Sequence, residues 1–442
     1  MMKGVENIMK KTIVIIGTLD TKEAEAEYLK EQIRKLRCTP LLLDISLREY
    51  KPKIVKPDIS NEDVAKASGL SIKDVSSKER GEAAELMSKG ASRIIKDLWD
   101  SGKINGVIGY GGGTGLSMLS LIMKNLPFGA PKLIVTTMAE MAGRAIGAKD
   151  IVIFPSITDL AGGEKINRIE AITLANAAGA IVGMVKAKPQ LPSEKPLIVM
   201  SQFGVTTPCV QKAKEILENH GYEVVTFHAV GTGGRAMEDL IRSGIAVAVL
   251  DVTTHELVDE LVGGVCKAGQ DRMEAAGEKG IPQVILPGAL DMVNFYEPSS
   301  VPEKFKDRRF YYHTPIDTLM RTSKEESAEL GKIFASKLNK AKGPTVMLIP
   351  MKGWSEYDKE GGVKTVDYYG KETDQPWFDP EADAAFIEAL EAHVDRSKQN
   401  LEILKVDYHI NDPKLAELSA LILDSMIKGK WKKGVIKNFT PT

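Results

Sequence analysis

The chain has 442 residues, with 59 Lys and Arg against 60 Asp and Glu, so its formal net charge is -1. At about 100–200 residues per domain, this length predicts two or three domains, each large enough to bury a core. A net charge so close to zero lacks the basic excess that is typical of proteins that bind DNA or RNA. The three cysteines are too few and too scattered for a disulfide framework or a zinc site.

The sequence predicts a cytoplasmic protein with neither a nucleic acid nor a membrane as a partner. No apolar run approaches the roughly 18–20 residues that a membrane-spanning helix needs. The first eleven residues include lysines but lack the apolar segment of a signal peptide.

The first half of the chain has the pattern of a parallel α/β domain. Residues 12–16 are β-branched and apolar on both faces, which predicts a buried parallel strand. The turn at 17–21 leads into apolar residues at helical spacing, so the chain opens with a βαβ unit. Further strands are predicted at 40–44, 106–109, 132–136 and 150–154, with helices at 81–100 and 171–185.

The second half repeats this plan after a stretch rich in Pro and Lys at 186–193, which predicts a domain boundary. Strands at 197–200, 223–227 and 246–249 alternate with helices, one of which begins at Pro208. We therefore predict an α/β fold of two Rossmann-like domains, residues 1–190 and 195–442, with mainly parallel sheets and a ligand cleft between them. The alternative is one large sheet that a proline-rich loop interrupts.

Residues 351–380 show no clear period and include Trp354 and Trp377. A loop of this length inside a compact domain is usually a lid, an interface arm or a disordered segment. We expect one of these three.

Glycine, threonine and aspartate gather where the predicted strands end. In open parallel sheets, ligands bind outside the carboxyl ends of the strands. The run Gly111-Gly112-Gly113-Thr114-Gly115 lies between a strand and a helix, where amides freed from side chains can approach a phosphate. It lacks the Gly-Lys-Ser/Thr ending of a P-loop, and the first strand lacks the dinucleotide fingerprint. A turn that serves tight packing alone is the alternative.

Two other strand ends carry charge. Asp20 and Lys22 flank the first predicted helix, so Lys22 could meet a phosphate and Asp20 a ribose hydroxyl or a magnesium ion. A helix cap and a solvated side chain are the alternatives. Gly233-Gly234-Arg235 is a second glycine turn, whose guanidinium suits phosphate or carboxylate, or else forms a surface salt bridge.

The candidates for catalysis are weaker. Cys209 follows the start of a helix, where the dipole lowers the pKa of a thiol, although a small buried hydrophobe is the alternative. Asp251 and Asp291 end parallel strands and could hold ligand hydroxyls or transfer protons. His255 could act as an acid or base, or could simply be a satisfied histidine.

Five stretches of this sequence resemble the family of the tomato mosaic virus resistance protein and its bacterial and archaeal relatives. They are residues 16–22 (IGTLDTK), 203–210 (FGVTTPCV), 233–240 (GGRAMEDL), 288–295 (GALDMVNF) and 408–412 (YHIND). The resemblance covers essentially the whole chain. It implies two Rossmann-like domains, a homodimer, and bound ATP with magnesium; it assigns no catalytic residue. Plant members continue into a TIM-barrel-like region beyond the residue that matches Thr442 here.

Three functions follow as hypotheses. The first is an ATP-Mg site in the interdomain cleft, and the second is an enzyme site for a phosphorylated or carboxylated metabolite. The third is a dimeric interaction module that uses residues 351–380. The magnesium ligands are not assigned; Asp20 is the candidate. The residues expected to bind the nucleotide are Gly17, Thr18, Asp20, Thr21, Lys22, Gly111, Gly112, Gly113, Thr114, Thr137, Thr206, Thr207, Gly233, Gly234 and Arg235.

Overall fold

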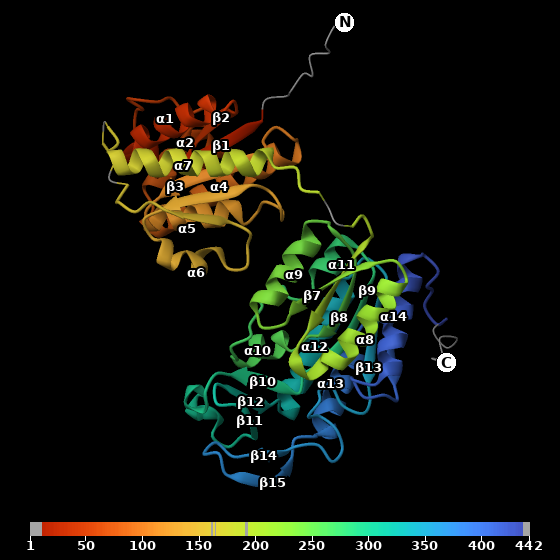
Figure 1. The fold of residues 1–442 in the computed structure, drawn as a ribbon. Coiled ribbons are helices and arrows are strands. Elements are labelled where there is room, and N and C mark those ends of the chain that lie inside the picture. Colours follow the sequence, from red (N-terminus) through yellow and green to blue (C-terminus); the bar gives the residue numbers. More distant parts are fainter. Residues whose placement is uncertain (1–10, 161, 164, 191–192, 436–442) are drawn as a thin grey trace, which may run out of the picture. The chain divides into compact units, whose positions relative to one another are not determined.

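The computed structural model describes residues 11–160, 162–163, 165–190 and 193–435. The chain divides into two compact units, residues 1–190 and residues 191–442. Each unit is built around its own mainly parallel sheet (Figure 1). The prediction of an α/β fold with two Rossmann-like domains is confirmed.

The sheet of unit 1 has five strands in the order β2-β1-β3-β4-β5, and every neighbouring pair is parallel. The strands are β1 (Thr12–Gly17), β2 (Thr39–Asp44), β3 (Gly106–Gly111), β4 (Lys132–Thr136) and β5 (Val152–Pro155). After β1 the chain moves outward to β2 and then returns to the other side of β1 to form β3. The order of the strands thus reverses between β1 and β3, which makes this the topological switch point of the sheet.

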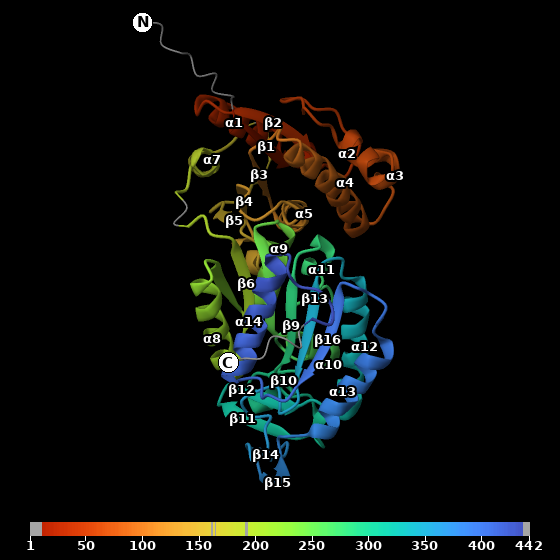
Figure 2. The same ribbon diagram turned by 90° about the vertical axis from the view of Figure 1, so that its right-hand side faces the viewer.

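Helices cover both faces of this sheet, and alternate residues of β1 supply both cores. Ile13 and Ile15 pack with α1 (Leu19–Lys35) and α7 (Arg168–Lys186). Val14 and Ile16 face the opposite core, which contains α2 (Asn61–Ser68), α3 (Ile72–Ser76), α4 (Arg80–Asp100), α5 (Gly113–Met123) and α6 (Ala142–Ile146). Figure 2 shows α7 on one side of the strands and α2 with α4 on the other. Because both faces are covered, β1 is apolar throughout.

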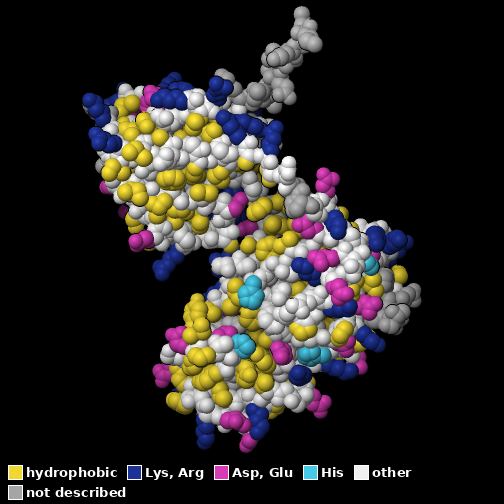
Figure 3. All heavy atoms as spheres, in the orientation of Figure 1, with side chains coloured by type: hydrophobic (Ala, Val, Ile, Leu, Met, Phe, Trp, Pro, Cys, Tyr) yellow, Lys and Arg dark blue, Asp and Glu magenta, His cyan; other side chains and the backbone are white. Residues whose placement is uncertain are grey.

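Helix α7 is, among the described residues, the one helix whose length and apolar composition would allow it to cross a membrane. Eight of its residues are buried in the domain, as in a core helix. On its outer side Ile169 and Ile172 remain exposed. Figure 3 shows hydrophobic side chains spread over the face of unit 1 that this helix crosses in Figure 1.

Unit 2 repeats the strand order of unit 1 and adds one strand. Its parallel sheet runs β16-β13-β9-β8-β6-β7, so its first strand, β6, again lies between the second and the third. The strands are β6 (Leu197–Gln202), β7 (Glu223–His228), β8 (Ala246–Thr253), β9 (Gln283–Gly288), β13 (Thr345–Pro350) and β16 (Leu401–Val406). This shared order agrees with the repeat seen in the sequence.

Two groups of helices flank this sheet. The core on one face includes α8 (Thr207–Asn219) and α14 (Pro413–Ile427). The cores on the other face include α9 (Thr232–Arg242), α10 (Glu256–Val262), α11 (Ala275–Lys279), α12 (Lys324–Lys340) and α13 (Pro380–His393).

Unit 2 also holds an antiparallel sheet in the order β10-β12-β11-β14-β15. Its strands are β10 (Met292–Phe295), β11 (Phe310–Thr314), β12 (Asp317–Arg321), β14 (Lys364–Val366) and β15 (Glu372–Pro376). The last two belong to residues 351–380, for which we expected a lid, an arm or disorder. Because Trp354 and Trp377 are buried and β14 and β15 extend the antiparallel sheet, the alternative of a disordered segment is wrong. β15 is largely exposed, and a role as a lid or an interface arm stays a prediction.

Candidate functional site

A cavity of about 660 Å³ lies at the carboxyl edge of the sheet of unit 1. Its walls include the loops that follow β1 and β3, the two strands that flank the switch point, together with the segment before α4. The lining residues are Thr18, Asp20, Thr21, Lys22, Leu47, Arg48, Val75, Ser76, Lys78, Glu79, Arg80, Ala83, Gly111, Gly112, Gly113, Thr114 and Gly115. Two loops that lie 90 residues apart in the sequence therefore meet where open α/β sheets bind their ligands.

The glycine loop after β3 does not need glycine at every position for its own fold. Gly112 is the N-cap of α5 with φ -83° and ψ -154°, a conformation open to any residue. A Cβ atom on Gly112 would lie 3.6 Å from the Thr137 hydroxyl, and one on Gly113 would lie 3.8 Å from Met138 Cγ, both ordinary contacts. Packing therefore does not account for these two glycines. A missing side chain here leaves the backbone open to the cavity.

Three helices begin at the wall of this cavity. Its lining includes residues from the first turns of α1, α4 and α5. The first N–H groups of a helix have no partner within that helix, and the helix dipole adds partial positive charge there. Four cationic side chains, Lys22, Arg48, Lys78 and Arg80, line the cavity against the acidic Asp20 and Glu79. The cavity is thus built to attract an anion.

Tyr110 of β3 fixes the shape of the loop after β1. Its phenol donates a hydrogen bond to the carbonyl of Lys22 at 2.9 Å, and Lys22 has non-helical backbone angles inside α1. Gly17 makes room for this ring, since a Cβ there would lie 2.3 Å from it. Gly17 is thus a packing residue and does not line the cavity, in contrast to the other predicted residues of this loop.

Asp20 presents a carboxylate that is exposed to solvent. Its backbone N–H donates to the Ser46 hydroxyl at 3.0 Å, and Ser46 in turn donates to the carboxylate of Asp44 at 2.5 Å. The described residues contain no cluster of three or more His, Cys, Asp or Glu that could hold a metal ion by itself. Magnesium, however, is commonly held by one or two carboxylates together with the phosphates of a ligand. Asp20 fits that smaller role.

Burial raises the pKa of Asp44, although hydrogen bonds from Ser46 and Tyr50 oppose this shift. The Asp44 carboxylate also accepts a bond from the N–H of Leu19 at the start of α1. The hydrogen bonds of Asp44 therefore hold the loop after β1 in place.

Sequence reasoning missed the wall formed by Arg48, Ser76, Lys78 and Arg80, which lie in or just before the polar stretch 51–80, where we predicted no strand or helix. The signal that could have organised this stretch is a pair of capping boxes, Ser60 with Asp63 and Ser71 with Asp74 in the described helices α2 and α3. Thr137, which we predicted as a contact, does not line the cavity but lies beside Gly112.

The other predicted contacts belong to unit 2, where the second glycine turn already receives an anion from the protein itself. The Glu256 carboxylate accepts hydrogen bonds from the N–H of Gly231 at 2.6 Å and of Gly234 at 3.2 Å. A Cβ on Gly233 would lie 1.8 Å from the His228 carbonyl oxygen, and one on Gly234 would lie 2.0 Å from Glu256. The start of α9 therefore binds an internal carboxylate, and both glycines serve close packing.

Arg235 donates a hydrogen bond to the carbonyl of Lys267 at 2.6 Å. Thr206 is buried and shares a 2.7 Å hydrogen bond with Thr253, while the hydroxyl of Thr207 donates to the Phe203 carbonyl. That these residues reach a ligand across a cleft stays a prediction.

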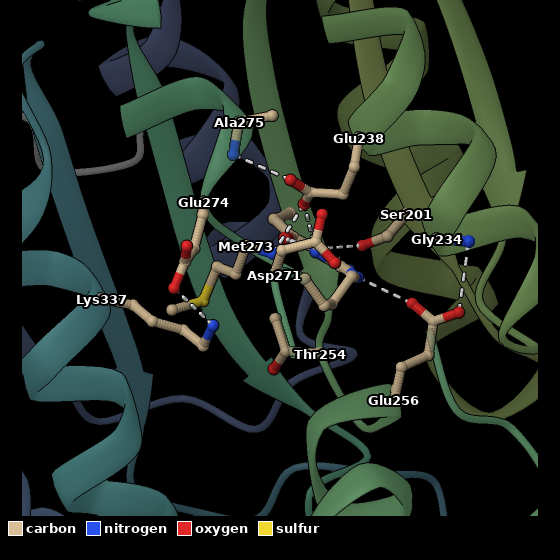
Figure 4. Close-up of polar contacts among 12 residues, drawn as sticks. Ser201, Gly234, Glu238, Thr254, Glu256, Asp271, Met273, Glu274, Ala275 and Lys337 are labelled. Atoms are coloured by element: carbon tan, nitrogen blue, oxygen red, sulfur yellow. Dashed lines mark hydrogen bonds and ion pairs between the residues drawn. The ribbon is translucent and has the colours of Figure 1, made fainter. Parts of the chain in front are cut away.

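Asp251 belongs to a buried ionic cluster around Arg272. The guanidinium of Arg272 bonds both oxygens of Asp251 at 2.5 and 2.7 Å and Glu256 at 2.7 Å, and it lies 3.4 Å from Glu238. Figure 4 shows Ser201, Glu238 and Glu256 converging on this point from different elements. All four charged side chains are buried. Asp251 is thus part of a structural network.

Cys209 lies in the core of unit 2, where burial raises the pKa of its thiol to about 12. This shift is opposite to the one that an activated nucleophile needs. His255 is also fully buried, beside Phe203, and burial lowers its pKa to about 3, so the ring is neutral. Cys209 therefore fits the alternative of a small buried hydrophobe. Both ring nitrogens of His255 are buried without a hydrogen-bond partner among the described residues, so the alternative of a satisfied histidine is wrong.

Asp291 is a second catalytic candidate with unused bonding capacity. Its Oδ2 accepts hydrogen bonds from Ser355 at 2.8 Å and from the Trp377 indole at 2.7 Å. Its Oδ1 is buried without a partner among the described residues. Burial and the nearby Asp358 raise the pKa of Asp291 to about 6.

Comparison with known proteins finds relatives that match most of the length of this chain. Among them, a UPF0261 protein of Clostridium tetani is 46% identical over 424 residues, 95% of this chain and 100% of that protein. The ToMV resistance protein Tm-1(GCR237) of Solanum lycopersicum is 35% identical over 94% of this chain but 55% of its own length. Among solved structures, MurG of Acinetobacter baumannii covers 63% of this chain and 78% of its own, with 13% identity and a TM-score of 0.23.

The family models match both units. Residues 11–190 match the N-terminal domain of the uncharacterised protein family UPF0261, and residues 195–427 match its C-terminal domain. These matches and the Tm-1 relative confirm the resemblance to the tomato mosaic virus resistance protein family. The chain therefore belongs to the UPF0261 family.

Proposed function

We propose that unit 1 binds the phosphate groups of ATP with magnesium in the cavity at its switch point. The observation that carries this proposal is the meeting of two loops there, one of which holds Gly112 and Gly113 in conformations that do not require glycine. Amides at the start of α5 would donate to phosphate oxygens.

Charge supports the same assignment. Lys22, Arg48 and Arg80 line the cavity, and the one charge partner described for them is Glu25, which interacts electrostatically with Lys22. These cations can therefore face a ligand that carries several negative charges. Lys78 pairs with Glu82 at 3.0 Å on the exposed surface, an interaction that is weak enough to be exchanged. Asp20 would supply the carboxylate for magnesium.

Calorimetry on the full chain tests the proposal. The Gly112→Val variant places a side chain between the loop and the ligand, and charge-assisted hydrogen bonds contribute about 1.5–3 kcal/mol each. Loss of one or two of them weakens ATP binding by at least about tenfold. Gly179→Ala on α7 is the matched control, because a Cβ there contacts nothing within 4 Å. Equal affinities of wild type and Gly112→Val for ATP-Mg would refute the proposal.

A second candidate is an enzyme site in unit 2 for a phosphorylated or carboxylated metabolite, with Asp291 as the proton-transferring group. The unpartnered Oδ1 of this buried carboxyl and its raised pKa favour it. A thermal-shift screen of metabolites with and without ATP separates the candidates. Stabilisation by an acidic metabolite in the absence of ATP would support the enzyme, whereas stabilisation by ATP alone would support the nucleotide site. Self-association as a homodimer and a cytoplasmic location are proposed from the family resemblance.

A further inference from the structure

A second hollow of about 340 Å³ adjoins the glycine loop. It lies between α5 and the segment that includes η1 (Ala139–Met141) and α6, and we refer to it as the α5–α6 groove. Gly113 lines both this groove and the larger cavity. Any ligand whose phosphate reaches the start of α5 therefore has the groove directly beside it.

The walls of the groove are largely apolar, unlike those of the larger cavity. Leu121, Met138 and Met141 line it and are exposed to solvent. Exposed apolar side chains that gather in a hollow indicate a binding surface. Methionine side chains adapt their shape and make favourable contacts with aromatic rings. Arg144 also lines the groove, and its planar guanidinium can stack on such a ring.

Ser120 supplies an independent observation. It lines the groove from α5, is 2% exposed, and its hydroxyl has no hydrogen-bond partner among the described residues. A buried hydroxyl without a partner destabilises a fold, so a ligand atom that bonds it is the physical remedy. A hydrocarbon chain cannot provide that bond, and a sugar or carboxylate would not use the apolar walls. A flat heteroaromatic ring uses both.

We propose that the α5–α6 groove binds the base of the nucleotide whose phosphates lie at the glycine loop, with the Ser120 hydroxyl bonded to a heteroatom of the ring. This inference rests on the proposed function and identifies the ligand class of the site as an aromatic nucleotide. The two hollows then have separate roles. The larger cavity binds the charged phosphates, and the groove binds the ring of the base.

Calorimetry with two probes, ATP and inorganic tripolyphosphate, each with magnesium, tests the assignment on the full chain. The wild type is expected to bind ATP at least about tenfold more tightly than tripolyphosphate, since only ATP carries a base. Ser117→Phe fills the groove from its exposed rim. It is expected to lower ATP affinity to that of tripolyphosphate and to leave tripolyphosphate binding unchanged.

Two further variants sharpen the result. Ser120→Ala is expected to weaken ATP binding by roughly threefold to tenfold without lowering the melting temperature, because it removes an unpaired buried hydroxyl. Ser336→Phe, at an exposed position on α12, is the matched control and should change neither affinity. Equal wild-type affinities for both probes, or wild-type ATP affinity in Ser117→Phe, would overturn the groove assignment alone. Binding of neither probe would overturn the phosphate site as well.

Discussion

Replacing Arg272 with methionine removes the only cation bonded to the buried carboxylates of Asp251 and Glu256 among the described residues. Methionine approximates the length of the arginine stem, so the change deletes charge and hydrogen bonds more than volume. The variant leaves both carboxylates buried without a counter-charge, and it leaves Glu238 with only the 3.8 Å contact to the partly exposed Arg242.

Breaking a buried ion pair from one side costs about 3–5 kcal/mol. In a domain of this size, 1 kcal/mol shifts the melting temperature by about 2–4 °C. Thermal unfolding of Arg272→Met should therefore occur roughly 6–20 °C below that of the wild type. The deficit should shrink as the pH is lowered. Burial raises the pKa of Glu238, and loss of the opposing Arg272 charge raises it further, so protonation at lower pH removes the uncompensated charge of this carboxylate.

Arg242→Met is the matched control. This arginine contacts Glu238 at 3.8 Å together with Asp271 and Glu278, but its side chain is 30% exposed. Partly exposed pairs of this kind contribute about 1 kcal/mol or less, so the shift should be only a few degrees. A melting temperature of Arg272→Met equal to that of the wild type would refute the view that this cluster holds unit 2 together.

Three other experiments test individual assignments. Burial raises the pKa of Asp291 from 3.8 to about 6, so its contribution to stability is complete below about pH 4 and is lost as the pH rises to 6. The midpoint of urea unfolding should therefore depend less on pH over this range in Asp291→Asn than in the wild type. An unchanged pH dependence would contradict the shift. With a thiol pKa of about 12, Cys209 should resist alkylation in the native chain at pH 8, and rapid labelling would reinstate it as a nucleophile. Gly17→Ala should lower the melting temperature, because its Cβ would lie 2.3 Å from Tyr110, whereas Gly179→Ala should not; equal melting temperatures would contradict the packing role of Gly17.

Local sequence patterns carried enough information for the fold and for part of the site. The β-branched run of β1 and the glycine run after β3 each mark a strand end, and parallel strands bring such ends to one edge. Lys22 and Gly112 could therefore be placed together before the structure was known. Arg48 and Arg80 could not, because surface cations in an aperiodic stretch carry no signal of what they face.

Contacts between residues far apart in the chain explain the other features that the sequence did not predict. The start of α9 has the properties of an anion site, as its sequence indicates, but the anion is Glu256, which follows Gly234 by 22 residues. Trp377 bonds Asp291 across 86 residues, so a segment without any period becomes part of the core. Neither partner could be identified from spacing.

The most direct test of the phosphate site is a crystal structure of the full chain grown with ATP and magnesium. We expect phosphate oxygens about 3 Å from backbone nitrogens at the start of α5, beside Gly112 and Gly113. An ordered triphosphate bound elsewhere, with this loop free of ligand, would contradict it.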